Sequence, residues 1–108
     1  VTVVSVAEAI GGILPAASLP ESLRRTLFDA AKSCAEEMMQ NLCDCGAHVR
    51  STVRSGHSAD EILAAAQEQD ADLIVVGARG RTRAGPFRMG DVAQKIVKYA
   101  SCSALVVR

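Results

Sequence analysis

The last third of the chain contains two short apolar runs separated by a glycine-rich loop and an amphipathic segment. The first segment, residues 72–76, consists of Asp72 and four apolar residues and leads directly into Gly77; the second covers residues 104–107. Between them, apolar residues recur at helical spacing from Val92 to Ala100. Short continuous apolar runs are typical of strands in buried parallel sheets. The order strand, loop, helix, strand therefore predicts a parallel pair with a right-handed crossover.

The beginning of the chain predicts another strand and helix. Residues 1–6 are expected to form a buried strand, and the Gly, Pro and Ala residues at 11–17 a loop. Ser18 is expected to open a helix, with Glu21 completing a capping box and Pro20 in the first turn. The expected buried stripe is Leu23, Leu27, Ala31, Cys34, Met38 and Leu42, and Gly46 is expected to end the helix.

The middle of the chain predicts an edge strand followed by a second helix. Residues 48–54 alternate between the two faces of a strand, which indicates a half-solvated position. Gly56 is expected to turn the chain, and Ser58 with Glu61 forms a second capping box. The buried face of this helix is expected to contain Ile62, Leu63 and Ala66.

Composition limits the class of protein. The chain has 108 residues, 49% of them hydrophobic and 3% aromatic, with no Trp, so its core is built from aliphatic side chains. Together with the alternation of strands and helices, this predicts an α/β protein with a flavodoxin- or Rossmann-like, three-layer parallel sheet and helices on both faces. A chain of this length suits a single domain over residues 1–108.

Charge and cysteine content predict the compartment and exclude some partners. The net charge is zero, with 12 basic and 12 acidic residues, so no nucleic-acid partner is implied. No secretory signal or apolar run of membrane-spanning length is visible, so no membrane insertion is expected. The four cysteines then point to a reducing compartment, and a cytoplasmic location is expected.

The loop after residue 77 is the main candidate for a binding site. Gly77 and Gly80 are expected to turn the backbone sharply, and Gly90 to open a helix N-terminus that favours phosphate. Such a loop leaves the carboxyl end of a strand, where ligands bind in open parallel sheets. The alternative is a charged loop that serves solubility alone. Four arginines supply cations suited to phosphate oxygens: Arg79, Arg81, Arg83 and Arg88.

The spacing Gly77-x2-Gly80-x9-Gly90 resembles the nucleotide-binding signature of the universal stress proteins, and the strands on both sides match as well. The resemblance runs over residues 1–108. It implies a flavodoxin-like sheet of five parallel strands, dimers formed through the last strand, and, in one branch, ATP as ligand. It implies a regulatory role. The cofactor expected is therefore ATP or another adenine nucleotide, with or without Mg²⁺. The sequence offers no obvious general base or metal cage, so an enzyme such as a slow nucleotidase is the least favoured alternative and no catalytic residue is expected.

By position, the resemblance assigns a set of nucleotide-binding residues. The three glycines would line the ribose and phosphates, together with the backbone of Asp91 and Val92. Val6, at the end of the first strand, would lie beside the base or ribose. The predicted nucleotide-binding residues are Val6, Gly77, Arg79, Gly80, Gly90, Asp91 and Val92.

Two features depart from the family pattern. Asp91 stands where the ATP-binding pattern has Ser or Thr, and a carboxylate repels phosphate unless Mg²⁺ bridges the two. The plainer interpretation is that Asp91 stabilises the helix dipole. The first strand and helix of the family are also missing, because Val1 matches the second strand. We expect the full-length protein, or a partner chain, to supply them.

Other reactive residues predict little chemistry. Cys43 and Cys45 with His48 lack the spacing of a zinc knuckle, and the simpler interpretation is a helix end with incidental thiols. His57 is a lone loop histidine, typically solvated. We therefore expect no metal site and no enzyme. The alternative to a nucleotide-binding module is an interaction module of the same fold, such as a dimerisation domain or the cytosolic domain of a transporter.

Overall fold

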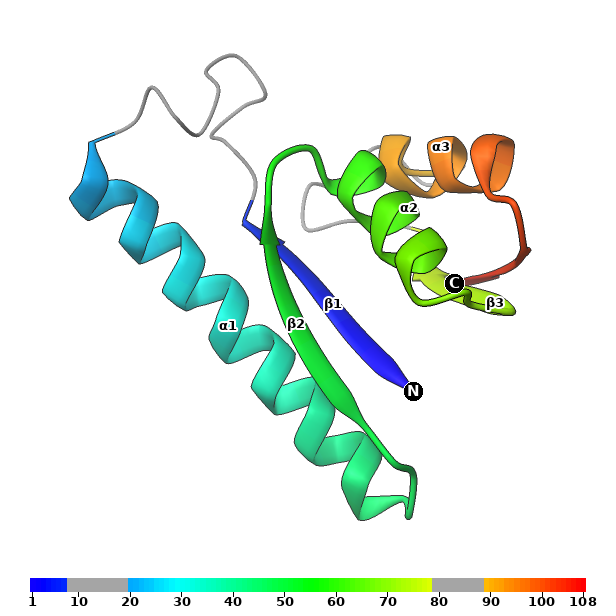
Figure 1. Ribbon diagram of the computed structural model, residues 1–108, viewed down its shortest axis with the longest axis horizontal. Helices are drawn as coiled ribbons and strands as arrows, with labels where there is room; N and C mark the ends of the chain where they lie inside the picture. Colours follow the sequence, from blue (N-terminus) through cyan, green and yellow to red (C-terminus); the bar gives the residue numbers. More distant parts are fainter. Residues whose placement is uncertain (8–19, 79–88) are drawn as a thin grey trace. The chain divides into compact units, whose positions relative to one another are not determined.

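The computed structural model describes residues 1–7, 20–78 and 89–108. The chain separates into two compact units, Val1–Glu61 and Ile62–Arg108, which are described in turn. The elements are β1 (Thr2–Ala7), α1 (Glu21–Asp44), β2 (Arg50–Ser55), α2 (Ser58–Glu68), β3 (Leu73–Gly77), α3 (Asp91–Tyr99) and β4 (Ser103–Val107) (Figure 1). This is the predicted alternation of strands and helices, and the α/β class is confirmed.

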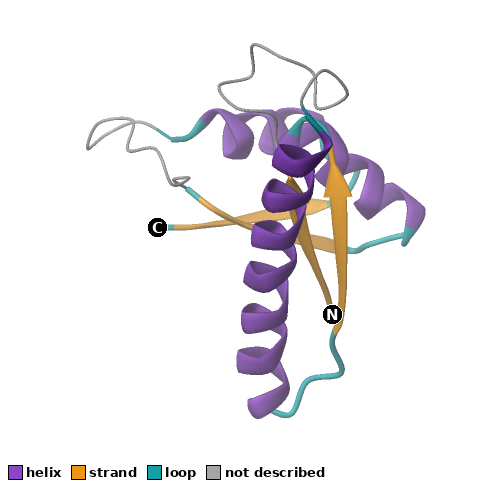
Figure 2. Ribbon diagram, turned by 90° about the vertical axis from the view of Figure 1, so that its left-hand side faces the viewer, coloured by secondary structure: helices purple, strands orange, loops and turns teal. Residues whose placement is uncertain are grey.

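The first unit is a parallel strand pair packed against one long helix. β1 and β2 pair in parallel, with Thr2 opposite Arg50 and Ala7 opposite Ser55. α1 runs along both strands (Figures 1 and 2) and contacts each of them. Among the described residues β2 pairs with β1 alone, as expected of an edge strand.

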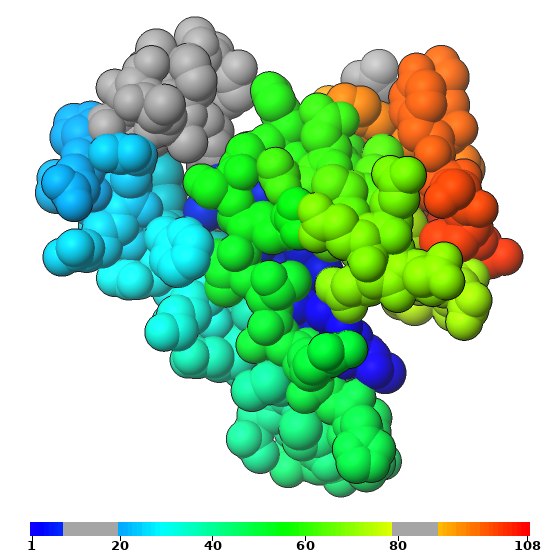
Figure 3. All heavy atoms as spheres, in the orientation of Figure 1, coloured from blue at the N-terminus to red at the C-terminus, as the bar shows by residue number. Residues whose placement is uncertain are grey.

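The buried stripe of α1 differs from the predicted one at two positions. Ala31 and Ala35 are the buried residues of this helix, whereas Cys34 is exposed and Met38 is 52% exposed. Ala35 and the half-buried Met39 occupy the face that the prediction gave to Cys34 and Met38. The physical reason is size, because two alanines four residues apart let the helix backbone approach the strands closely. In the space-filling view atoms of the N-terminal half of α1, blue to cyan, are visible on the face shown (Figure 3).

The two ends of α1 differ in how well they were predicted. The helix begins at Glu21 with Pro20 as N-cap, so Pro20 lies just before the first turn and not within it as predicted. Ser18, the predicted first residue of the capping box, lies outside the described residues. At the other end Gly46 is confirmed as the stop, with φ of 88°. The N–H of Gly46 donates to the carbonyl of Cys43 at 2.9 Å, and that of Ala47 to Leu42 at 3.3 Å. This pair of bonds is the Schellman motif.

The turn from β2 to α2 is built around Gly56. Its N–H donates to the carbonyl of Ala7 at 3.3 Å, and its φ of 138° is one that other residues rarely adopt. α2 begins at Ser58 itself, so Ser58 is the first helical residue and not the N-cap. The predicted capping box is therefore wrong. The Glu61 carboxylate instead accepts a hydrogen bond from Arg54 Nε at 2.7 Å.

The second unit contains most of α2, from Ile62 on, and then the predicted strand, loop, helix and strand. β3 and β4 pair in parallel, with Leu73 opposite Ser103 and Gly77 opposite Val107. α3 contacts β4 and buries Ala93 and Ile96, which are 1% and 0% exposed. Together with Ala65 and Ile74, which are also buried, they form the core of the unit.

β3 differs from the prediction in its burial. Its apolar run predicted a strand covered on both faces, but Leu73 and Val75 are 50% and 60% exposed while Ile74 is 7% exposed. Among the described residues β3 pairs with β4 alone, so the four strands form two separate parallel pairs. One face of the β3–β4 pair is therefore open.

Within the three ranges that the structure describes, no helix has the length and apolar character needed to cross a bilayer.

Candidate functional site

The candidate site lies at the carboxyl edge of the β3–β4 pair. Gly77 is the last residue of β3 and lies opposite Val107, the last residue of β4. The N–H of Ala78 donates to the carbonyl of Val107 at 2.7 Å, which extends the ladder by one step. The loop therefore leaves the edge at which ligands bind in parallel sheets. Arg108 directly follows Val107 and leaves β4 at this same edge, a cation that the sequence analysis did not single out.

A hydrogen bond closes the base of the loop. The N–H of Gly90 donates to the carbonyl of Ala78 at 2.6 Å, although the two residues are separated by the whole loop. This bond brings the N-terminus of α3 to the carboxyl end of β3. The closure was not predictable from sequence spacing, because it depends on where the loop returns.

The described glycines at this edge do not have the backbone conformations that would require glycine. Gly90 is the N-cap of α3, with φ of −61° and ψ of 155°, a conformation open to any residue. The glycines with positive φ in the described ranges are Gly46 and Gly56, so Gly77 makes no left-handed turn. The predicted sharp turn at Gly77 is therefore wrong, since that residue continues the strand. Gly80 and Arg79 lie outside the described residues.

α3 presents three backbone donors at this edge. The first intrahelical bond runs from the N–H of Gln94 to the carbonyl of Gly90 at 3.0 Å. The N–H groups of Asp91, Val92 and Ala93 precede that bond and have no acceptor within the helix. The N–H of Gly90 is not a fourth free donor, because it is bonded to the carbonyl of Ala78. The partial positive charge of a helix N-terminus adds to these three donors.

The side chain of Gln94 also belongs to the site, and the sequence analysis missed it. Its Nε2 donates to the carbonyl of Met89 at 2.6 Å, five residues back in the chain. Met89 is the first described residue after the loop. The sequence signal that could have identified Gln94 is its position four residues after Gly90. Side chains on a helix tilt toward its N-terminus, so a glutamine at this position can reach the backbone at the start of the helix.

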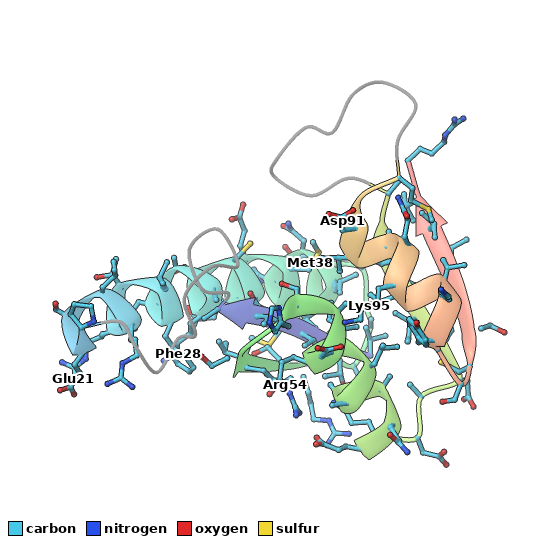
Figure 4. All side chains as sticks on the ribbon, turned by 90° about the horizontal axis from the view of Figure 1, so that it is seen from above. Glu21, Phe28, Met38, Arg54, Asp91 and Lys95 are labelled. Atoms are coloured by element: carbon cyan, nitrogen blue, oxygen red, sulfur yellow. The ribbon has the colours of Figure 1, made fainter. Side chains whose placement is uncertain are left out.

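Asp91 occupies the first turn of α3 and is exposed. Figure 4 shows it at the start of the helix, with Lys95 one turn further along. A carboxylate at this position interacts favourably with the helix dipole. The same carboxylate lies within the first turn that offers the three backbone donors, so it disfavours an anion there unless a cation intervenes.

The other predicted residues are distributed over the first unit. Val6 is half-buried in β1, opposite Arg54. Cys43 and Cys45 are exposed thiols at the end of α1, and His57 is exposed before α2. Within the described ranges, no three His, Cys, Asp or Glu side chains come together as a metal site would require.

An ion pair lies near the carboxyl ends of β1 and β2. Arg54 and Glu61 are joined at 2.7 Å, with their side chains 23% and 28% exposed. Figure 4 labels Arg54 on β2. The pair connects the end of β2 with the first turn of α2.

Comparison with known proteins agrees with this architecture. The model of the universal stress protein family matches residues 1–108, the whole of the sequence. The chain belongs to the universal stress protein family. The resemblance noted in the glycine spacing is therefore confirmed at the level of the family.

Members of the family from several organisms are similar to the chain. Universal stress protein MJ0531 of Methanocaldococcus jannaschii is 30% identical over 106 residues, which is 98% of this chain and 61% of that protein. A universal stress protein of Thermus aquaticus is 38% identical over 88 residues, 82% of this chain and 62% of that protein. The chain thus spans about three fifths of the length of these two relatives.

Solved structures of the family share the fold. The structure of MJ0577 superimposes with a TM-score of 0.83 at 25% identity, covering 98% of this chain and 73% of that one. UspA of Lactobacillus plantarum gives a TM-score of 0.75 at 24% identity, covering 99% of this chain and 76% of that one.

Proposed function

We propose that this universal stress protein is a regulatory module that binds an adenine nucleotide, ATP, at the carboxyl edge of β3. The single observation that carries the proposal is the 2.6 Å bond from Gly90 to Ala78. It holds the open N–H groups of α3 at the edge from which the glycine-rich loop departs. Backbone donors at a helix N-terminus are a general solution for binding phosphate.

Charge supports the same ligand. Arg79, Arg81, Arg83 and Arg88 follow Gly77 in the sequence, and Arg108 leaves β4 at the same edge. Guanidinium groups bind phosphate oxygens through paired hydrogen bonds. The residues that the resemblance assigned stay the proposed ligand residues: Gly77, Arg79, Gly80, Gly90, Asp91 and Val92 in the second unit and, as a separate assignment, Val6 in the first.

We further propose that the protein acts by conformational change and dimer contacts in the cytoplasm, not by turnover. The supporting observation is β4, which pairs with β3 alone among the described residues and so has a second edge available. A short apolar edge strand is suited to pairing with a second copy.

Thermal unfolding of the purified protein with ATP, with ATP and Mg²⁺, and with adenosine tests the proposal. ATP at a hundred times its dissociation constant should stabilise the fold by about 2.7 kcal/mol, while adenosine should stabilise it less because it lacks the phosphates. Stabilisation by ATP only when Mg²⁺ is present would indicate a metal bridge to Asp91. An unchanged Tm at saturating ATP, in a protein that unfolds cooperatively, would contradict nucleotide binding.

The exposed carboxylate of Asp91 favours a second candidate, an interaction module of the same fold that binds no nucleotide. The charge at the α3 N-terminus would then serve the helix dipole alone. The two candidates separate in the Asp91→Ser variant: binding confined to the variant would identify the natural protein as the interaction module.

A further inference from the structure

The side chain of Gln94 is hydrogen-bonded to the Met89–Gly90 peptide, which lies between the loop and α3. We propose that Gln94 is a positioning residue of the phosphate site: it fixes the orientation of the Met89–Gly90 peptide and so sets the affinity for phosphate-bearing ligands without touching them. The inference rests on the proposed function.

Both polar groups of the Met89–Gly90 peptide are occupied. Its carbonyl oxygen accepts from Gln94 Nε2 at 2.6 Å, and its N–H donates to the carbonyl of Ala78 at 2.6 Å. One partner comes from α3 and the other from the residue that follows β3. The peptide plane is thus held from two elements that the loop separates in the chain.

Gln94 is tied to the same place by its backbone. Its N–H donates to the carbonyl of Gly90 at 3.0 Å, the first bond of α3. Side chain and backbone of one residue therefore bind the two successive carbonyls of Met89 and Gly90. Rotation of the Met89–Gly90 peptide would break the Gln94 and Ala78 bonds together.

The orientation of this peptide decides what an anion meets at the helix N-terminus. In the observed orientation the Met89 carbonyl oxygen is covered by an amide donor, and the N–H groups of residues 91–93 remain available. A peptide freed from Gln94 would sample orientations in which the carbonyl faces the approaching phosphate. A carbonyl oxygen and a phosphate oxygen are both acceptors and repel each other.

The expected effect is that of one hydrogen bond. Gln94 is exposed, so water competes for its amide, and its loss should weaken ATP binding about threefold to tenfold. Adenosine binding should change little, because the affected donors serve the phosphates. A general loss of folding would affect both ligands alike, so the ratio of the two affinities identifies a positioning role.

The test uses Gln94→Met, which is similar in size, uncharged and lacks the donor, with Gln67→Met as the matched control. Gln67 is an exposed glutamine near the end of α2. Calorimetric titration of the purified protein with Mg²⁺-ATP and with adenosine gives the affinity ratio. Equal ATP affinities of the Gln94→Met and Gln67→Met variants, with wild-type binding intact, would overturn the inference and leave the proposed function standing.

A second measurement does not depend on nucleotide. Amide hydrogen exchange of Gly90 without ligand should be about threefold to tenfold faster in Gln94→Met than in wild type. Gln94→Lys, which restores a donor, should return the protection. An unchanged exchange rate of the Gly90 amide in Gln94→Met would overturn the inference even if wild type binds no ATP. A faster rate in Gln94→Met that returns to the wild-type rate in Gln94→Lys would support the role of Gln94 in fixing the Met89–Gly90 peptide. Absence of ATP binding by wild type would by itself contradict the proposed function.

Discussion

Arg54 Nε lies 2.7 Å from Glu61 Oε2, so an arginine near the end of β2 is paired with a glutamate in the first turn of α2. The two residues flank Gly56, whose backbone continues the β1–β2 ladder to Ala7. This pair replaces the capping box that the Ser58 and Glu61 spacing suggested. It links β2 to α2, and the coupling free energy between the two side chains therefore reports whether the turn holds them together.

A double-mutant cycle should detect this pair. Arg54→Met and Glu61→Gln each remove one charge, and their coupling should be about 0.3–1 kcal/mol because both side chains are about a quarter exposed. Arg54 makes further interactions, so its single variant should cost more than the coupling. Urea unfolding of the four proteins gives the value, and a coupling indistinguishable from zero would contradict the pairing.

Gly56→Ala should destabilise the protein by about 2–3 kcal/mol, since its φ of 138° disfavours any side chain. An added Cβ would also lie 3.0 Å from Glu61 Oε1 and 3.2 Å from Glu61 Cγ. Gly46→Ala is the control. Gly46 also has a positive φ, 88°, but a Cβ added there would have nothing within 4 Å, so this substitution should destabilise the protein by only about 1 kcal/mol. Comparable losses in both variants, measured by urea unfolding, would count against the contact with Glu61.

Ala35→Leu should destabilise the protein by about 1–3 kcal/mol, because Ala35 is 1% exposed and the added atoms would be forced into a packed interface. Ala30→Leu is the same substitution on the exposed side of α1 and should stay within about 0.5 kcal/mol. Thermal or urea unfolding measures the loss of stability in each variant. Equal effects would mean that the buried face of the helix is not the one described.

Asp91→Ser should raise the affinity for ATP about threefold to tenfold, because it removes a negative charge from the α3 N-terminus and supplies a hydroxyl donor. The gain from charge should shrink in high salt. Asp29→Ser, at an exposed position of α1, makes the same change in net charge and should leave the affinity unchanged. A weaker affinity of Asp91→Ser in Mg²⁺ would instead favour a metal bridge through the carboxylate.

Leu105→Lys should weaken self-association about tenfold if the protein dimerises through β4, because lysines on an edge strand oppose strand pairing. Leu105 is 52% exposed on β4. Leu73→Lys is the control, at a residue 50% exposed on the neighbouring strand β3. Sedimentation over a range of concentrations measures both, and a monomer mass independent of concentration would refute the dimer.

The order and type of the elements could be predicted from local patterns. Apolar runs at residues 72–76 and 104–107 lie within one residue of β3 and β4, and Gly46 ends α1 as predicted. Such features depend on neighbours in the chain, because strand alternation, helical spacing and the left-handed conformation of glycine are properties of a few residues each. The loop with its glycines and arginines was recognisable for the same reason.

Contacts between elements were beyond the reach of the sequence. Helical spacing allowed either Cys34 or Ala35 on the buried face, and only packing against the strands selected the alanine. The spacing of Ser58 and Glu61 suggested a capping box, whereas the turn at Gly56 brought Arg54 to the Glu61 carboxylate.

At the site, the sequence determined which residues are available: a helix N-terminus, Asp91 within it, and cations around it. The tertiary structure decided how they are used, since the Gly90 N–H bonds to Ala78 and the Gln94 amide to Met89. A hydrogen bond needs two groups at a set distance and angle, and that distance follows from how the loop closes, not from the residues that compose it.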